Sequence, residues 1–216
     1  MPVVDGARAI LFLAAKEGEG ASSVAASFAL MAAARAQRTA WLVDLDVRRN
    51  AAFRGFQKRF GPAVGLPGQA YDASLGLTVP LFSVPGGAQD DTSAAKMLTA
   101  HPLQGTRLLV TRFRGEHLRP GQQVQLRHNP QWWAALRKIT DWIVVDAPSL
   151  ERSSIGLRVL NQMDAVVLVV EADSPNVEEV QRLKREVTQM GGYILGVVLN
   201  RAADDAWRAA WHPGYP

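Results

Sequence analysis

The chain has 216 residues, of which 48% are hydrophobic and 20% are charged. This apolar content is enough for one large folded domain and too high for a disordered chain. No cysteine is present, which excludes disulfides and cysteine-bound metals, and the formal charge is only +4. We assign this mild excess of basic residues to a solvated surface rather than to a nucleic-acid site.

The sequence gives no sign of a membrane or metal protein. Its first residues lack the apolar run of a secretory signal, and apolar runs such as residues 165–170 are too short to cross a membrane. The histidines have no spacing typical of metal ligands. We therefore expect a cytoplasmic protein that reaches the inner membrane, if at all, through a protein partner.

Short apolar runs alternate with helical patterns along the chain. Residues 9–14 predict a buried strand, and the Ala-rich stretch from Ser22 to about Gln37 predicts a helix. Further strands are predicted at 39–44, 107–113, 142–146, 165–170 and 193–200. Further helices are predicted at 131–140 and at 176–190, the latter starting near Ser174-Pro175.

This alternation predicts an α/β fold: a doubly wound, mostly parallel sheet with helices on both faces. We expect a single domain over residues 1–216 with an irregular insertion at about 54–105, where glycine and proline are frequent. One strand is predicted within it, at 77–84, although Pro80 argues against a central position. Residues 119–130 predict a second loop.

A glycine-rich turn follows the first predicted strand. Gly18 and Gly20 would let the backbone curl around an oxyanion at a helix N-terminus. Ser22 or Ser23 could cap that helix, and the Ser22 hydroxyl could bind Mg²⁺. A strand–helix turn without any ligand would have a similar sequence, so the turn alone does not establish a phosphate site.

Polar side chains also follow three other predicted strands. These residues are Asp44, Asp46, Arg48, Arg49, Asp146, Asn200 and Arg201. Because the carboxyl ends of parallel strands meet at one edge of a sheet, ligands bind there. The glycine-rich turn and these side chains are therefore expected to converge.

Together the motifs resemble the deviant-Walker P-loop superfamily of MinD and ParA. Within it they are most similar to the cytoplasmic tyrosine autokinases of bacterial capsule and exopolysaccharide export. That branch typically reads P-G-E-G-K-S in the loop, D-x-D-x-R-R after the second strand and D-x-P-P after the Walker B strand. The resemblance covers about residues 9–50 and 131–201, and the stretch from Asp44 to Arg49 is its most specific part.

The resemblance implies ATP or ADP and Mg²⁺ as ligands. It implies that Asp44 and Asp46 organise Mg²⁺ and the attacking group as catalytic residues, and that Asp146 is a Mg²⁺ ligand through water. It also implies that Lys16 reaches the partner's phosphates in a nucleotide-bound dimer. The remaining nucleotide-binding positions are Gly18, Glu19, Gly20, Ala21, Ser22, Ser23, Asn200 (at the adenine) and Arg201.

The chain departs from the family pattern at two positions of these motifs. Ala21 stands where the loop has its lysine, and losing such a charge-assisted contact costs about 1.5–3 kcal/mol, or roughly a 10- to 100-fold loss of affinity. Ser149 replaces the second proline of D-x-P-P. Lys16, Arg48 or Arg49 could supply another cation.

The acidic residues also have a purely structural interpretation. In that alternative, Asp44 and Asp46 cap their loop and pair with Arg48 and Arg49 on the surface.

The leading interpretation is a degenerate tyrosine-kinase-like protein that regulates polysaccharide biosynthesis or export, with weak or no ATP hydrolysis. Its expected partners are a membrane co-polymerase or an active kinase homologue, and a homodimer is possible. Alternatives are an active ATPase or autokinase with a substituted cation, and a ParA- or MinD-like positioning ATPase. Trp132, Trp133 and Trp142 are assigned to the core or a partner surface, and Trp207 and Trp211 to an intramolecular or protein contact rather than to a membrane.

Overall fold

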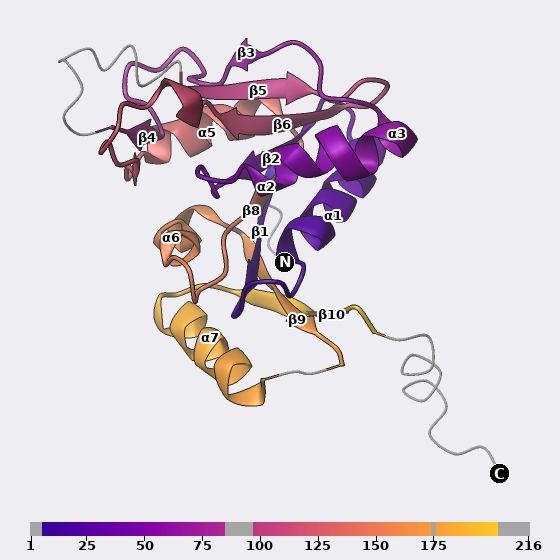
Figure 1. The fold of residues 1–216 in the computed structure, drawn as a ribbon, viewed down its shortest axis with the longest axis vertical. Helices are drawn as coiled ribbons and strands as arrows, with labels where there is room; N and C mark the ends of the chain where they lie inside the picture. Colours follow the sequence, from indigo (N-terminus) through magenta and orange to yellow (C-terminus); the bar gives the residue numbers. More distant parts are fainter. Residues whose placement is uncertain (1–5, 85–96, 174–175, 203–216) are drawn as a thin grey trace.

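The structure is a computed structural model, described here for residues 6–84, 97–173 and 176–202, without the side chains of residues 59–62. Its main element is an eight-stranded sheet in the order β10-β9-β1-β8-β2-β6-β5-β3 (Figure 1). The strands are β1 Arg8–Ala14, β2 Ala40–Asp44, β3 Tyr71–Asp72, β5 Leu98–Pro102, β6 Leu108–Phe113, β8 Trp142–Asp146, β9 Ala165–Glu171 and β10 Ile194–Asn200.

Strands β10 to β6 pair in parallel, whereas β5 and β3 are antiparallel additions at the far edge. A separate small ladder pairs β4 (Phe82–Ser83) with β7 (Gln125–Leu126). The helices are α1 Ala21–Arg35, α2 Ala51–Gly55, α3 Gly61–Val64, α5 Pro130–Ile139, α6 Ile155–Arg158 and α7 Val177–Gln189, and short turns are η1 Phe56–Phe60, η2 Gly115–His117 and η3 Leu160–Gln162.

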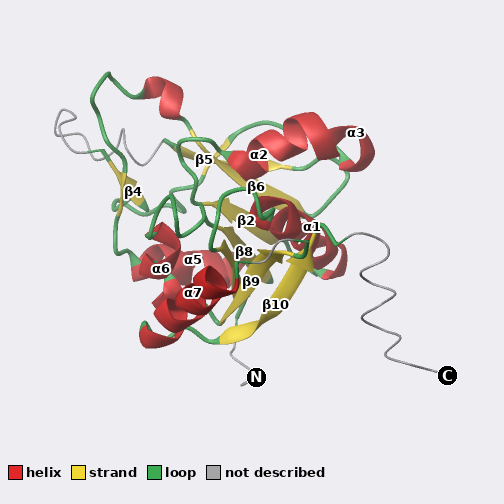
Figure 2. Ribbon diagram, turned by 60° about the horizontal axis from the view of Figure 1, so that its bottom comes forward, coloured by secondary structure: helices red, strands yellow, loops and turns green. Residues whose placement is uncertain are grey.

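Helices cover both faces of the sheet, with α1, α2 and α3 on one side and α5, α6 and α7 on the other (Figure 2). Alternation along β1 divides the core between these faces: Leu11 and Leu13 pack toward α5 and α7, whereas Ile10 and Phe12 pack toward α1. The buried face of α1 consists of alanines, which lets the helix lie close against the sheet. The predicted doubly wound, mostly parallel α/β fold is confirmed.

Helix α5 shows how the sequence positions a helix against the sheet. Asn129 caps it by accepting the Trp132 N–H at 3.1 Å, and Pro130 begins it. Trp132 is fully buried and donates its indole N–H to the Ala73 carbonyl at 2.8 Å, while Trp133 is also buried. The assignment of these two tryptophans to the core is confirmed, whereas Trp142 is only half-buried.

The described parts of the insertion at 54–105, residues 54–84 and 97–105, contain more regular secondary structure than their composition predicts. Only Phe82–Ser83 of the strand predicted at 77–84 is extended, and the structure adds β5 at Leu98–Pro102, which the sequence analysis missed. The irregular segment also starts with helix rather than loop, because α2, η1 and α3 follow one another from Ala51 to Val64. Asp44 accepts the N–H of Ala52 in the first turn of α2 at 2.9 Å. These differences are corrections to the predicted layout.

The start of α7 and the C-terminal tryptophans lie at or beyond the limits of the described residues. Helix α7 is capped by Asn176, whose side chain accepts the Glu179 N–H at 3.2 Å; the expected start at Ser174-Pro175 lies outside the described residues. The Trp207 and Trp211 segment lies outside them as well. Within the described ranges, no helix has both the length and the apolar character needed to cross a bilayer.

Candidate nucleotide site at the carboxyl edge of the sheet

The glycine-rich turn joins β1 to α1 at the carboxyl edge of the sheet. Gly18 and Gly20 have φ angles of 93° and 90°, a left-handed conformation that favours glycine. Gly20 is the N-cap of α1, and no side chain caps this helix. The prediction that Ser22 or Ser23 caps it is therefore wrong: both lie inside the first turn, because the helix already begins at Ala21.

The N–H groups of this turn have different acceptors. Glu19 folds back so that its carboxylate accepts the Lys16 N–H at 2.8 Å, and Glu151 accepts the Glu17 N–H at 3.1 Å. Among the described residues, none accepts a hydrogen bond from the N–H groups of Gly18, Glu19 or Gly20. The turn therefore keeps donors available for an oxyanion at the start of a 15-residue helix.

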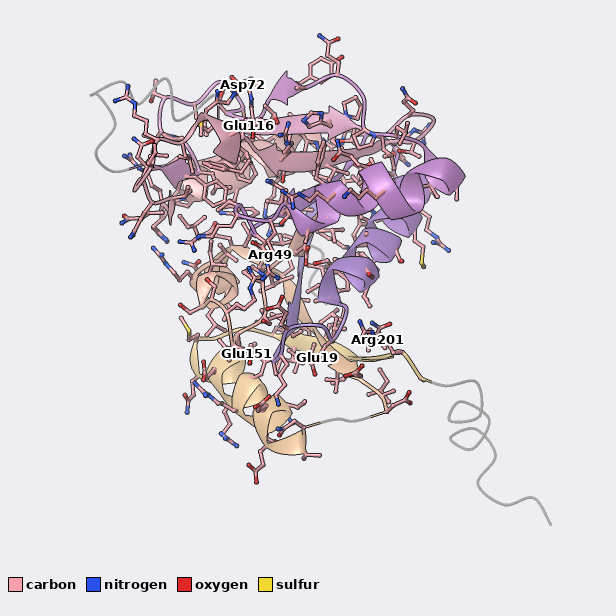
Figure 3. All side chains as sticks on the ribbon, viewed as in Figure 1. Glu19, Arg49, Asp72, Glu116, Glu151 and Arg201 are labelled. Atoms are coloured by element: carbon pink, nitrogen blue, oxygen red, sulfur yellow. The ribbon has the colours of Figure 1, made fainter. Side chains whose placement is uncertain are left out.

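The end of β10 lies directly against this turn. Asn200 donates its side-chain N–H to the Glu19 carbonyl at 2.8 Å, so the amide holds the loop from the side where the resemblance puts the adenine. Arg201, with φ of 58°, forms an ion pair with Glu171 at 3.0 Å at the end of β9. Figure 3 shows Glu19, Glu151, Arg49 and Arg201 in the same part of the molecule.

We expect Gly20→Ala to destabilise the protein more than Gly18→Ala. Both positions have positive φ, which costs about 1 kcal/mol or more for a residue with a Cβ. A Cβ at Gly20 would also lie 2.0 Å from the Asn200 amide nitrogen, whereas at Gly18 it meets nothing within 4 Å. Urea unfolding of both variants measures the difference, and the excess cost at Gly20 should vanish in an Asn200→Ala background. An equal cost at both glycines would contradict this contact.

Asp44 and Asp146 lie side by side at the ends of neighbouring strands, β2 and β8, whose residues pair in register at these positions. Both carboxylates are buried, with exposed fractions of 1%. Asp44 accepts the N–H groups of Asp46 and Ala52, each at 2.9 Å, with one oxygen for each. Asp44 therefore both shapes the turn that follows β2 and starts α2.

Asp146 differs from Asp44 because neither of its carboxylate oxygens has a hydrogen-bond partner within the described structure. Burial raises the pKa of Asp146 to about 7; the Ser22 side chain acts against this rise, and the Asp46 carboxylate adds to it. Burial and the neighbouring Asp146 also raise the pKa of Asp44 well above its ordinary value. Both shifts favour the neutral forms of these carboxyls, and a bound cation would favour the ionised forms instead.

The ion pairs around the turn differ from those of the purely structural interpretation, in which Asp44 and Asp46 pair with Arg48 and Arg49. Asp46 is buried and accepts from Arg152 at 2.7 Å, Arg49 pairs with Glu17, and Lys16 pairs with Glu179 of α7 at 3.2 Å. The expected pairing of Asp44 and Asp46 with Arg48 and Arg49 on the surface is therefore wrong.

The loop between β8 and α6 fastens to the glycine-rich turn, and sequence reasoning missed its role. Leu150 and Glu151 donate backbone N–H groups to Ala14 and Ala15 at 2.9 and 3.1 Å. The Ser149 carbonyl accepts the N–H groups of Arg152 and Ser153, both at 3.0 Å, which fixes a tight turn after Asp146. The only signal in the sequence was the position of this loop, directly after the D-A-P-S stretch.

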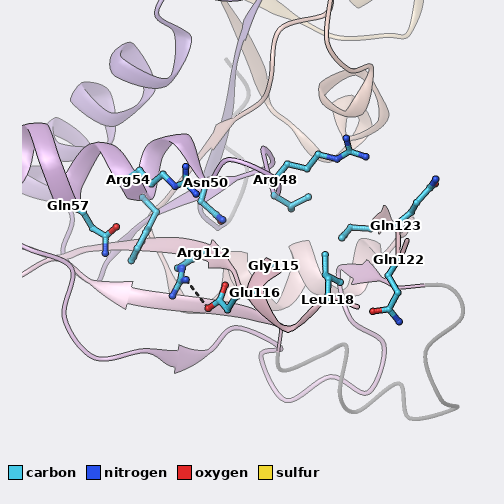
Figure 4. Close-up of a pocket in the computed structure, with 13 residues that line it drawn as sticks. Arg48, Asn50, Arg54, Gln57, Arg112, Gly115, Glu116, Leu118, Gln122 and Gln123 are labelled. Atoms are coloured by element: carbon cyan, nitrogen blue, oxygen red, sulfur yellow. Dashed lines mark hydrogen bonds and ion pairs between the residues drawn. The ribbon is translucent and has the colours of Figure 1, made fainter. Parts of the chain in front are cut away.

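Two hollows flank α2. A cavity of about 300 Å³ lies between the first turn of α1 (Ser22, Ser23) and the exposed cations Arg54 and Lys58. A larger cleft, of about 710 Å³, lies between α2 and the segment after β6 (Figure 4). Arg48, Arg54 and Arg112 line this cleft, and Arg112 pairs there with Glu116 at 2.8 Å. Arg48 therefore lines a basic cleft, and in the described structure it forms no ion pair with Asp44 or Asp46.

The described part of the chain holds no group of three or more His, Asp or Glu side chains arranged to bind a metal ion unaided. Magnesium in nucleotide sites commonly keeps several waters and is held by one or two protein groups together with phosphate oxygens. Asp146, with two buried oxygens that lack donors, and the neighbouring Ser22 fit that mode of binding. The residues present are therefore compatible with Mg²⁺ that arrives with a nucleotide.

The chain matches no protein-family model. It is 26% identical over 190 residues to the tyrosine-protein kinase CpsD of Streptococcus agalactiae serotype Ia, covering 88% of this chain and 72% of that protein. A shorter match, 33% identical over 66 residues, links it to CpsD of Streptococcus pneumoniae serotype 4, over 31% of this chain and 29% of that protein.

Solved structures share the fold. The VpsO kinase domain superimposes with a TM-score of 0.59 at 21% identity, covering 91% of this chain and 86% of that one. The kinase domain of the Escherichia coli tyrosine kinase ETK gives 0.58 at 17%, covering 100% and 74%. A putative plasmid partition protein of Borrelia burgdorferi, bound to AMPPNP, gives 0.56 at 15%, covering 92% and 76%.

The curated relatives of this chain are thus bacterial tyrosine kinases of the CpsD type. Its structural neighbours are bacterial tyrosine kinase domains and P-loop proteins of the partition type. These similarities lie in the same direction as the resemblance that the motifs suggested, and the structural matches confirm the fold.

Proposed function

We propose that the chain is a nucleotide-binding regulator of polysaccharide biosynthesis or export, and that it hydrolyses ATP weakly or not at all. The single observation that carries this proposal is Ala21 at the start of α1, within a site whose other parts are assembled. The turn keeps free N–H donors, Asn200 holds it from the β10 side, and the acids of β2 and β8 lie together beside Ser22. Such a site can hold phosphate oxygens but lacks the loop cation.

The environment of Asp44 supports weak catalysis. A general base must be free to reach the proton that it removes. Both oxygens of Asp44 already accept backbone N–H groups, and its carboxyl is buried with a raised pKa. Asp46, the other candidate, is paired with Arg152 at 2.7 Å. In the proposed function these acids organise the site and its Mg²⁺, and they contribute little to phosphoryl transfer.

The role in polysaccharide assembly rests on the similarity to CpsD proteins over most of this chain. By that analogy, the partner is a membrane co-polymerase or an active kinase homologue, and nucleotide binding controls the docking. Lys16 is consistent with a dimer as the bound state. The Lys16 side chain is 42% exposed, and its ion pair with Glu179 is partly open to solvent. Because exposed ion pairs contribute little to stability, Lys16 is available to a second copy of the chain.

Calorimetric titration of the purified protein with Mg-ATP, together with phosphate release and phosphotyrosine detection, tests this function. We expect binding in the micromolar to millimolar range, roughly 4–8 kcal/mol, and phosphate release near the uncatalysed background. Rapid hydrolysis or self-phosphorylation that Asp44→Ala abolishes would show an active enzyme instead. Failure to bind any nucleotide would leave only a scaffold.

A further inference from the structure

Arg152 lies between the glycine-rich turn and Asp46, which follows β2. Its Nη1 lies 2.7 Å from Asp46 Oδ2, and its Nε lies 3.7 Å from Glu17 Oε2 on the turn. It thus contacts both structural parts that would surround the terminal phosphates of a nucleotide. Neither motif analysis nor the family pattern assigns it a role.

Arg152 is also the best shielded of the three cations paired at this site. Its side chain is 24% exposed, against 42% for Lys16 and 52% for Arg49. A charge shielded from water interacts more strongly with an anion than an exposed charge does, because screening is weaker. The Asp46 carboxylate also raises the pKa of Arg152, so this guanidinium remains charged.

The hydrogen-bonding capacity of Arg152 is only partly used. A guanidinium has five N–H donors in a planar fork suited to phosphate oxygens. One strong contact, from Nη1 to Asp46, is short, whereas the Nη2 contact to Asp46 is 3.4 Å and the Nε separation from Glu17 exceeds hydrogen-bonding distance. The remaining donors can therefore bind an oxyanion while Nη1 stays on Asp46.

The backbone around Arg152 holds it in place. Its N–H bonds to the Ser149 carbonyl, and the preceding Glu151 is tied to the turn by its backbone N–H, which Ala15 accepts at 3.1 Å, and by its carboxylate, which accepts from Glu17. A fixed side chain loses less conformational entropy on binding a ligand than a mobile one. This favours Arg152 over the exposed Arg54 and Lys58 beside Ser22 and Ser23.

We propose that Arg152 supplies the phosphate-binding charge that the turn lacks at Ala21, and that it contacts the β- or γ-phosphate of a nucleoside di- or triphosphate. This inference rests on the proposed nucleotide-binding function. The charge has moved from the turn itself to the loop after β8, which crosses over the same turn. Arg152 is thereby a binding residue whose contact distinguishes ATP and ADP from AMP.

The test measures dissociation constants of ATP, ADP and AMP by equilibrium dialysis, with and without Mg²⁺. We expect Arg152→Ala to weaken ATP and ADP about 10- to 100-fold and to leave AMP within about twofold, because AMP lacks the phosphates concerned. Arg152→Lys, which keeps the charge without the fork, should fall between the two. The matched control is Arg35→Ala, an exposed arginine at the opposite end of α1.

Two further variants separate binding from folding. Removing Arg152 leaves the buried Asp46 unpaired, so the titration is repeated with Asp46→Asn combined with Arg152→Ala. Asp46→Asn alone is the reference for this double variant, because it carries the same change at Asp46, and ATP and ADP should bind the double variant more weakly than this reference. Adding Ala21→Lys to Arg152→Ala should restore ATP affinity by returning the charge to the turn. If Arg152→Ala binds ATP as tightly as the native protein does, the role of Arg152 is overturned and the proposed function still stands. Native protein that binds no nucleotide would overturn both.

Discussion

Asp146→Asn is expected to raise the free energy of unfolding at about pH 8 by up to ~4 kcal/mol, with little change at about pH 4. Burial without donors raises the pKa of this carboxyl from 3.8 to about 7. In the unfolded chain it ionises near its ordinary pKa, so between these two values the folded protein holds more protons than the unfolded chain. Native stability should therefore fall as the pH rises from about 4 to 7.

Asparagine cannot ionise, so the variant escapes this loss. Removing the Asp146 charge also relieves Asp44, whose raised pKa has the same sign. Urea unfolding at several pH values measures both proteins. The control is Asp141→Asn, because Arg38 and two backbone N–H groups lower the pKa of that carboxyl, so its removal should destabilise the protein above about pH 4. A native protein with constant stability across this range would contradict the assignment.

Ala21→Lys is expected to tighten Mg-ATP binding by about tenfold or more, since a charge-assisted contact contributes roughly 1.5–3 kcal/mol. Ala21 begins α1, directly after the left-handed Gly20, which is where the turn presents its free N–H groups. Phosphate release should rise as well if the acids beside Ser22 are still competent. Calorimetry and a phosphate assay check the two expectations separately.

The matched control for this gain is Ala34→Lys, an exposed alanine near the end of the same helix, which should leave nucleotide affinity unchanged. The gain from Ala21→Lys should also be larger in an Arg152→Ala background than in the native one, because the two cations serve the same phosphates. Equal gains in both backgrounds would mean that Arg152 acts elsewhere. Unchanged affinity in a folded Ala21→Lys protein would mean that the absent lysine does not limit binding.

The strands of the parallel sheet could be predicted because they are short, mostly apolar and bounded by turns. Strand β5 could not: it reads Leu98-Thr-Ala-His-Pro102, with two polar residues and a terminal proline, so its burial pattern depends on its partner β6. The buried ring of His101 bonds to Thr99 and to the Gly68 carbonyl, which lies far from it in the sequence. Such tertiary contacts override local preference.

The candidate site also has a part that the sequence predicts and a part that it does not. Motif spacing places Asp44, Asp146 and Asn200 at strand ends and Ser22 at the start of the helix that follows β1, and the parallel sheet brings these positions together. The contacts of Arg152 depend instead on how the loop after β8 crosses the glycine-rich turn, a geometry that no local pattern encodes. The pairing of Asp46 therefore could not be derived from the nearer arginines in the sequence.

The position of β1 also governs when the chain can fold. It lies inside the sheet between β8 and β9, with Arg8 opposite Trp142 and Ile10 opposite Ala165. During synthesis β1 emerges well before either neighbour exists, because β8 and β9 follow it far along the sequence. Until then the nascent chain exposes an unpaired apolar strand next to its alanine-rich helix, and we expect it to depend on chaperones for that interval.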